Sequence, residues 1–227
     1  MIDWDYISGL DFGIVWEYRL PLFRGFLLSL VLMVIATVLG FSIGTILAIG
    51  ARSKIHPVRW LIVAYVEFWR NTPLIVQLVW IHFALPLVTG ISTTALQSGL
   101  IGLSLNTAAY YSEIVRAGID SIPSGQWEAA DSLGLPKRVK WMRVILPQAI
   151  KIIVPPMTSM VIGVFKGTAI LSILAVNDLM KVANTISNFT FKPVEIVTAA
   201  AIIYFMTGSI LSWASRRVEK HFQKSER

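Results

Sequence analysis

The chain has 227 residues, of which 55% are hydrophobic and 15% are charged. This apolar fraction exceeds what the core of a soluble domain of this length needs, so lipid is the expected solvent for much of the surface. The absence of cysteine excludes disulfides, thiolate metal sites and a cysteine nucleophile. A formal net charge of +7 does not indicate nucleic acid binding, because the basic residues gather at the ends of apolar blocks, where membrane topology places them.

The apolar blocks predict five membrane-spanning helices in a single domain, residues 1–227. A bilayer core needs about 20 apolar residues per helix, and residues 25–51 contain no charged side chain. Proline and glycine in residues 86–90 predict a turn between the second and third helices. The predicted spans are approximately residues 22–51, 58–85, 94–116, 150–176 and 195–216. Helix-breaking residues predict that the fourth span is bent or interrupted: Pro155, Pro156, Gly163 and Gly167.

Lysine and arginine are distributed asymmetrically about these helices. They follow the first, third and fifth spans, in residues 52–59, 116–151 and 216–227, whereas the N-terminal segment is acidic and includes Asp3 and Asp5. Because basic residues accumulate on the cytoplasmic side of short loops, the N-terminus is predicted to be outside and the C-terminus cytoplasmic. The acidic start does not resemble a cleavable secretory signal, so the first apolar block is expected to remain in the mature protein.

The largest predicted cytoplasmic loop, residues 121–147, has the pattern of two short helices. Ser124 is expected to cap the first helix, and Gly134 to end it in a left-handed conformation. A second helix over residues 137–144 then leads to Pro147 and the fourth span. One interpretation is an amphipathic helix that lies on anionic lipid headgroups.

The same loop resembles the EAA signature of permease subunits in ABC importers. The residues that carry the resemblance are Glu128, Ala129, Ala130, Gly134, Val144, Leu146 and Pro147, with valine at 144 where isoleucine is usual. Residues 65–80 and 103–126 resemble further segments of polar amino acid permeases of the histidine, glutamate and arginine type. Residues 154–170 are most similar to glutamate/aspartate permeases.

This resemblance implies an all-α polytopic membrane protein with the MetI-like fold of ABC importer permeases. It further implies that the loop is a helix-turn-helix that docks in a cleft of an ATPase subunit, with Trp127, Ala129 and Leu133 packing into that cleft. The residues that the resemblance assigns to ATPase coupling are Gln126, Trp127, Glu128, Ala129, Ala130, Leu133, Gly134, Leu146 and Pro147.

The implied assembly lies in a bacterial inner membrane and imports an amino acid. Its expected members are two copies of an ATPase subunit, a second permease that is identical or paralogous, and an extracytoplasmic binding protein. The phosphate-binding motif GxxxxGK[ST] is absent from this sequence, so the chain is not expected to be an enzyme and the ATPase must be a separate subunit. No cofactor is expected. The three histidines, His56, His82 and His221, are isolated in sequence, so no metal site is predicted. His82, which lies in the second span, is expected to be hydrogen-bonded.

Ionisable groups at membrane depth are candidates for function. Glu67 and Arg70 are three residues apart and are predicted to form a structural ion pair that shapes a bend at Pro73. The predicted substrate-binding residues are Asn106, Tyr110, Glu113, Lys166 and Thr168.

In this interpretation Glu113 attracts the ammonium of an amino acid, while Lys166 and backbone N–H groups freed by a broken helix bind its carboxylate. Helix-to-helix hydrogen bonding by the same groups is an equal alternative. The family usually has aspartate after this lysine, and Gly167 in its place favours an anionic substrate such as glutamate or aspartate.

Two other functions are compatible with an apolar polytopic chain. An ATP-independent secondary transporter or channel for small charged solutes is one, with Glu113 and Lys166 on the ion path. An intramembrane serine protease that uses Ser104 or Ser112 with His82 is the other, but no GxSxG-like element accompanies either serine. Neither function requires a capped helix pair on the cytoplasmic side, and residues 124–147 therefore favour the ABC permease.

Overall fold

The computed structural model describes residues 9–223, so Asp3, Asp5, Lys224 and Arg227, which entered the topology prediction, lie outside the described residues. The predicted all-α class is confirmed, and the described part of the chain contains no strand. The helices are α2 (Gly13–Glu17), α3 (Arg19–Gly50), α4 (His56–Asn71), α5 (Leu74–Val79), the π-helix η1 (Trp80–Ala84), α6 (Leu85–Thr89), α7 (Ala95–Asp120), α8 (Ser124–Ser132), α9 (Lys137–Val139), the π-helix η2 (Lys140–Ile145), α10 (Leu146–Thr168), the 3₁₀-helix η3 (Ala169–Leu174), α11 (Leu179–Thr190) and α12 (Pro193–Gln223).

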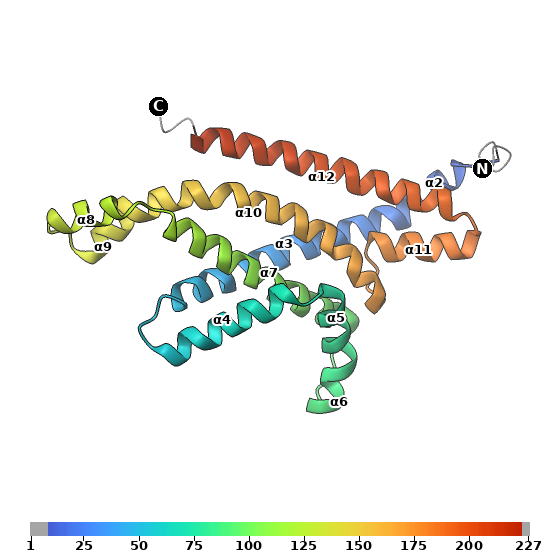
Figure 1. The fold of residues 1–227 in the computed structure, drawn as a ribbon. Helices are drawn as coiled ribbons and strands as arrows, with labels where there is room; N and C mark the ends of the chain where they lie inside the picture. The colour runs from blue at the N-terminus through green and yellow to red at the C-terminus, as the bar shows by residue number, and fades with distance from the viewer. Residues whose placement is uncertain (1–8, 224–227) are drawn as a thin grey trace, which may run out of the picture.

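Helix α7 lies at the centre of the bundle and packs against α3, α4 and α10 (Figure 1). Its contact with α3 is close because α3 presents glycines: a Cβ at Gly40 would lie 2.6 Å from Thr107 Cγ2, and one at Gly44 would lie 2.7 Å from the Ala108 carbonyl oxygen. Small residues let helices approach in this way when no hydrophobic effect drives their association in lipid. The α3–α7 pair therefore forms the rigid part of the fold.

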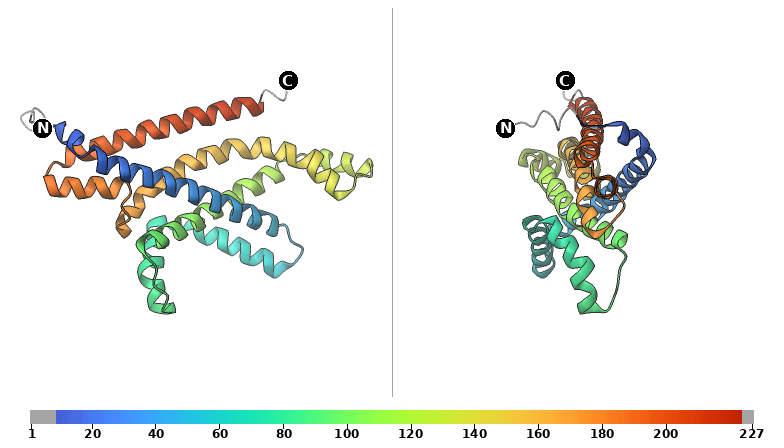
Figure 2. Two further views of the ribbon diagram at one scale, coloured as in Figure 1. Left: turned by 180° about the vertical axis from the view of Figure 1, so that it is seen from behind. Right: turned by 90° about the vertical axis from the view of Figure 1, so that its right-hand side faces the viewer.

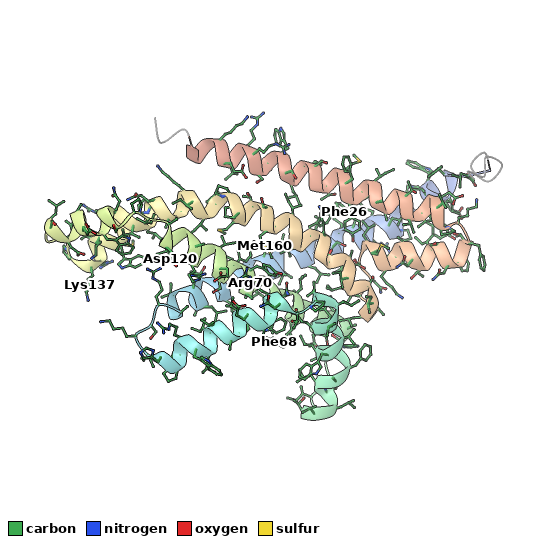
Figure 3. All side chains as sticks on the ribbon, viewed as in Figure 1. Phe26, Phe68, Arg70, Asp120, Lys137 and Met160 are labelled. Atoms are coloured by element: carbon green, nitrogen blue, oxygen red, sulfur yellow. The ribbon has the colours of Figure 1, made fainter. Side chains whose placement is uncertain are left out.

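The principal apolar core is formed by α3, α7 and α10. Its buried members include Leu32, Leu103 and Phe165, and Phe26 and Met160 pack against it (Figure 3). The outer faces of α3 and α12 carry exposed apolar side chains: Val31, Val34, Val38, Ile46, Ile202, Phe205 and Ile210. These faces suit lipid, as the apolar composition predicts, or another apolar chain.

Within residues 9–223, three helical stretches are long and apolar enough to span a membrane: Arg19–Gly50, Lys137–Leu174 and Pro193–Lys220. The bent pair α4 and α5–α6 makes a fourth if it counts as one span. Helix α7, with 26 residues, is about 39 Å long and could cross a bilayer, but its many serine, threonine, asparagine and glycine residues lower its hydropathy. The count of five spans thus stays a prediction.

The predicted second span is not a straight helix. It bends by 108° between α4 and α5, so the predicted bend at Pro73 is confirmed. As a result α6 projects away from the bundle (Figure 2), whereas α5 and η1 still contact α7. The predicted turn at residues 86–90 is only partly correct, because the helix continues through Pro86 to Thr89 and ends at Gly90 with φ +70°.

The predicted fourth span has its break at a different place. Helix α10 is continuous through Pro155, Pro156, Gly163 and Gly167, so the expectation of freed backbone groups beside Lys166 is wrong. The chain instead changes to the 3₁₀-helix η3 and turns at Ala175, which has φ +62°. The next helix, α11, was not predicted. Its N-cap is Asp178, whose carboxylate accepts a hydrogen bond from the Lys181 N–H at 2.9 Å.

Candidate functional site

The predicted loop 121–147 forms a helical hairpin at one end of the molecule (Figure 1). Its first arm, α8, ends as predicted at Gly134, which has φ +62°. The Leu135 N–H donates to the Ala130 carbonyl (3.1 Å) and the Gly134 N–H to that of Asp131 (2.9 Å), which is the Schellman arrangement that satisfies the last carbonyls of a helix. The prediction that Ser124 caps the helix is wrong. Pro123 occupies the N-cap position, Ser124 is the first helical residue, and no side chain caps the helix.

The second arm of the hairpin is continuous with the fourth membrane helix. From Lys137 to Leu174 the chain forms one helical stretch of 38 residues, so Pro147 does not separate two helices as expected. Proline is tolerated here because it lies in the first turn of α10, directly after the π-helical turn η2. The second arm of the hairpin and α10 are therefore parts of one helical stretch.

Aromatic and polar contacts hold the two arms together. The rings of Trp127 and Trp141 pack edge-to-face with centroids 5.2 Å apart. Lys140 bonds to Asp131, and the Gln148 amide donates to the Gln126 amide oxygen at 3.1 Å. These contacts make the hairpin a rigid unit.

The predicted coupling residues divide into two groups. Trp127 and Ala130 face the hairpin's own interior: the first packs against Trp141, and the second is buried. Trp127 is therefore only partly exposed, and its insertion into a partner stays a prediction. The other predicted residues are exposed: Gln126, Glu128, Ala129, Leu133, Gly134, Leu146 and Pro147. Among them Leu133 is 76% exposed and is the apolar side chain that a docking surface would present.

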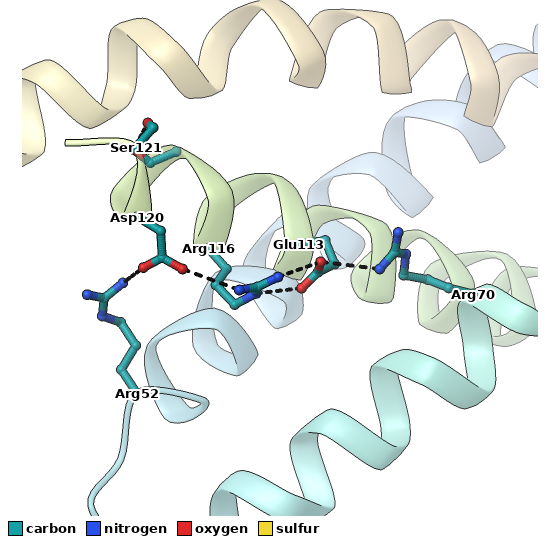
Figure 4. Close-up of polar contacts among 7 residues, drawn as sticks. Arg52, Arg70, Glu113, Arg116, Asp120 and Ser121 are labelled. Atoms are coloured by element: carbon teal, nitrogen blue, oxygen red, sulfur yellow. Dashed lines mark hydrogen bonds and ion pairs between the residues drawn. The ribbon is translucent and has the colours of Figure 1, made fainter. Parts of the chain in front are cut away.

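A chain of ion pairs runs along α7 toward the hairpin (Figure 4). Arg52, after α3, bonds to Asp120, and Asp120 also accepts from Arg116 at 3.3 Å. Arg116 donates to both carboxylate oxygens of Glu113, at 2.6 and 2.8 Å. The other end of the chain is Arg70 of α4, whose Nη1 lies 3.2 Å from Glu113 Oε2. Helices α4 and α7 and the end of α3 are thereby joined.

The predicted ion pair between Glu67 and Arg70 is wrong. Arg70 pairs with Glu113, and its guanidinium also lies 5.8 Å from the ring centroid of Tyr110. Glu67 instead accepts a hydrogen bond from the Asn71 amide at 2.7 Å. Of the predicted substrate residues, Glu113 and Tyr110 are therefore brought together, and both contact Arg70.

The Asn106 side chain forms hydrogen bonds at the bend in the second span. Its amide donates to the Trp69 carbonyl at 3.1 Å and to the Gln77 amide oxygen at 2.9 Å. Gln77 in turn donates to the Trp69 carbonyl at 2.9 Å and to the Thr72 carbonyl at 3.1 Å. These side chains satisfy carbonyl groups at the bend that lack helical partners. Asn106 therefore has the helix-to-helix hydrogen-bonding role that was the alternative to substrate binding. Gln77 was not predicted; its signal is a lone amide in an apolar segment four residues after Pro73.

Lys166 and Thr168 do not contact Glu113. Thr168 is fully buried and donates to the Phe165 carbonyl of its own helix at 2.8 Å. Lys166 is exposed and has no ion pair among the side chains that the structure describes. A Cβ at Gly167 would be 3.4 Å from Leu103, ten residues before Glu113 on α7, which is about 15 Å along that helix. Lys166 and Glu113 therefore lie at different levels of the bundle, and contact of both with one substrate stays a prediction.

His82 is hydrogen-bonded, as predicted. Its Nδ1 lies 2.9 Å from the Ser98 hydroxyl, which links η1 to α7.

Residues 40–224 match the family model described as binding-protein-dependent transport system inner membrane component. The chain belongs to this family of permeases. This permease is 39% identical over 197 residues to a putative glutamine transport system permease protein of Rickettsia bellii, across 87% of its own length and 90% of the relative. It is 32% identical over 217 residues to an arginine transport system permease protein of Bacillus subtilis, across 96% and 99% of the two chains.

Solved structures have the same fold. The permease aligns to a chain in the crystal structure of an amino acid ABC transporter with histidines, with a TM-score of 0.89 and 33% identity over 93% of this chain and 99% of the other. It also aligns to a chain of the inward-facing MetNI methionine ABC transporter, with a TM-score of 0.75 and 19% identity over 91% and 98%. The predicted MetI-like permease fold is confirmed.

Proposed function

We propose that this chain is the permease subunit of a bacterial ABC importer for polar amino acids and that it lies in the inner membrane. Two independent observations support the proposal. The relatives over most of its length are described as glutamine and arginine transport permeases. The loop with the EAA signature forms a rigid hairpin that is continuous with a membrane-spanning helix. The hairpin carries the proposal, because an ATP-independent transporter or channel has no use for it.

The proposed topology has five spans, with α7 as the third. The hairpin and the end of α12 lie toward one end of the molecule, whereas α2 and α11 lie at the other (Figure 2). This arrangement supports a cytoplasmic C-terminus and an outside N-terminus, together with the basic residues of the hairpin. Helix α7 is acceptable as a span because its polar face is buried against other helices.

The exposed face of the hairpin is the proposed docking surface for the ATPase. Glu128, Ala129 and Leu133 are exposed on α8, while Trp127 fixes the angle of that helix from within. The proposed assembly contains two permeases, two ATPase subunits and an extracytoplasmic binding protein. A permease pair is proposed because five helices of this size do not enclose a path between them.

The substrate class follows from the named relatives, and the narrower choice of glutamate or aspartate follows only from Gly167. That glycine lies beside Lys166 on α10, where a Cβ would lie 3.4 Å from Leu103 Cδ1 and 3.7 Å from Leu74 Cδ2. We therefore propose a polar amino acid and treat the acidic pair as its narrower form.

The test is the ATPase activity of the reconstituted assembly with its binding protein and each of glutamate, aspartate, glutamine, arginine and histidine. One amino acid should stimulate hydrolysis by the wild type, and Glu128→Arg should abolish the stimulation while the assembly stays intact. Glu17→Arg is the matched control: the same charge change on exposed α2, at the opposite end of the molecule, should leave stimulation unchanged. Uptake that proceeds without ATP, or equal stimulation in both variants, would contradict the proposal.

A further inference from the structure

A cleft between α4 and α7, beside the end of α3, has a volume of about 350 Å³. That volume is within the range of small-molecule sites. Its lining combines apolar and charged side chains: Ala51, Arg59, Ile62, Val63, Val66, Glu67, Ser112, Glu113 and Arg116. It lies on the side of the α3–α4 loop and the Arg52–Asp120 pair, which is the cytoplasmic side in the proposed topology (Figure 4).

The charges on the α7 wall of the cleft are already paired. Both carboxylate oxygens of Glu113 accept from Arg116, and one also contacts Arg70. Arg116 is shared further with Asp120. These groups form the rigid wall and have little capacity left for a ligand.

The charged side chains on the α4 wall retain hydrogen-bonding groups for a ligand. Among the described side chains, Arg59 has no hydrogen bond or ion pair, and Glu67 uses only one carboxylate oxygen, for Asn71. The two residues are eight positions apart on one face of α4, about 12 Å along the axis, which is too far for a direct pair. Their side chains are long enough to approach a common ligand placed between them.

The floor between these two charges is apolar. Ile62, Val63 and Val66 lie between Arg59 and Glu67 and face the cleft. When the Arg59 and Glu67 side chains extend toward each other, an ammonium and a carboxylate on one small molecule would match the two charges, and the apolar part of its own side chain would match the floor.

We propose that this cleft binds the transported amino acid on the cytoplasmic side, with its carboxylate at the Arg59 guanidinium and its ammonium at the free oxygen of Glu67. This inference rests on the proposed function and names the site at which the amino acid is held before release. Guanidinium is the side chain best suited to a carboxylate, which it can bind with two parallel hydrogen bonds. The predicted pairing of Glu113 with Lys166 is thereby replaced by a pair of groups on a single helix.

The test is equilibrium binding of the radiolabelled amino acid to the assembled transporter, without ATP and without the binding protein. The amino acid used is the one that stimulates ATPase activity. Competitors are its α-amide, which lacks the carboxylate charge, and its N-acetyl derivative, which lacks the ammonium. The wild type should bind both derivatives on the order of tenfold or more weakly than the amino acid, since each loses a charged hydrogen bond.

Each variant should lose one kind of discrimination. Arg59→Gln should bind the amino acid and its amide equally, and Glu67→Gln should bind the amino acid and its N-acetyl derivative equally. Arg59→Lys, which keeps the charge, should retain discrimination against the amide. Lys54→Gln is the control, because Lys54 is an exposed cation near α4 that does not line the cleft.

The outcomes separate the two proposals. If no amino acid stimulates the wild-type ATPase, the proposed function fails and the cleft assignment fails with it. If stimulation is present but Arg59→Gln and Glu67→Gln discriminate as the wild type does, or the wild type binds no amino acid under these conditions, the cleft assignment alone is overturned. Both substitutions lie at exposed positions, and intact assembly on gel filtration excludes misfolding as the cause of a loss.

Discussion

Arg70 of α4 forms its ion pair with Glu113 of α7, at 3.2 Å, although Glu67 lies one turn away on the same helix. Glu113 also accepts two hydrogen bonds from Arg116, so its carboxylate is the point where α4 and α7 are joined. This junction lies close to the bend at Pro73, where Asn106 and Gln77 bind the free carbonyl groups. The bent helix is therefore held to α7 by charge on one side of the bend and by amide hydrogen bonds at the bend itself.

A double-mutant cycle should detect this choice of partner. Arg70→Gln and Glu113→Gln should show a coupling energy of about 0.5–1 kcal/mol, the range for partly exposed pairs. The cycle of Arg70→Gln with Glu67→Gln should show coupling near zero. Denaturant titration of the purified permease in detergent measures both. Stronger coupling to Glu67 would mean that the two side chains form the local pair that spacing alone predicts.

Gly125, in α8, and Gly134, just after its C-terminal end, should respond in opposite ways to alanine. A Cβ on either Gly125 or Gly134 meets no atom within 4 Å, so backbone conformation alone decides the outcome. Gly134 has φ +62°, and alanine there should destabilise the end of the helix by about 1 kcal/mol. Gly125 is inside the helix, and alanine there should stabilise it by up to about 1 kcal/mol.

Hydrogen exchange of the hairpin amides provides the measurement. Gly134→Ala should accelerate exchange at residue 134 and Leu135, whose N–H groups make the terminal hydrogen bonds, and Gly125→Ala should slow exchange within α8. Equal effects of the two substitutions would show that the left-handed conformation of Gly134 is not required.

Features that depend on local backbone chemistry were predictable from the sequence. Proline after Thr72 limits helix conformation in the preceding residue, and glycine at 134 permits a left-handed end, so both positions were correctly placed. The prolines at 155 and 156 misled because α10 tolerates them without a break. Helix α11 was missed because it is short and amphipathic, and a search for long apolar blocks does not detect such a segment.

Features that depend on how helices pack were not predictable. Spacing made Glu67 the expected partner of Arg70, but the facing helix supplied Glu113 at shorter range. Lys166 and Glu113 each satisfied the criterion of a charge at membrane depth, yet they lie at different levels of the bundle. The cleft beside Arg59 exists because α4 and α7 stand apart at that level, and no residue pattern in either helix predicts the distance between them.

The close approach of α3 and α7 should make Gly44 intolerant of any side chain. A Cβ there would lie 2.7 Å from the Ala108 carbonyl oxygen and 2.9 Å from the Ser112 nitrogen, both backbone atoms that cannot turn aside. Gly44→Ala should therefore lower the free energy of unfolding by about 1–3 kcal/mol. Ser42→Ala, on the exposed side of the same helix, should change it by less than about 0.5 kcal/mol. Equal thermal stability of the two variants would contradict the packing.

Asp178 and Asp11 lie outside the candidate spans and should give pH effects of opposite sign. Burial raises the pKa of Asp178 to about 6, against hydrogen bonds from the α11 backbone that favour the ionised form. The hydrogen bond from Lys192 lowers the pKa of the exposed Asp11 below its ordinary value of 3.8. The first carboxylate is therefore better tolerated when protonated, and the second when ionised.

For Asp178 the folded state binds the proton more tightly than the unfolded chain does, so ionisation opposes folding fully above pH 6, and the effect disappears as pH falls from 6 toward 4. Asp178→Asn keeps a helix cap without the charge. It should raise stability by about 1–3 kcal/mol at pH 7.5 and not at pH 4, since the shift is about two pKa units. Asp11→Asn should instead lower stability at pH 7.5, with a difference that vanishes as pH falls through the lowered pKa of Asp11. Thermal unfolding of both variants and the wild type, from pH 7.5 through pH 4 to below the lowered pKa of Asp11, measures these differences. A stability gain for Asp178→Asn that is the same at pH 4 and pH 7.5 would show that the buried charge is not its cause.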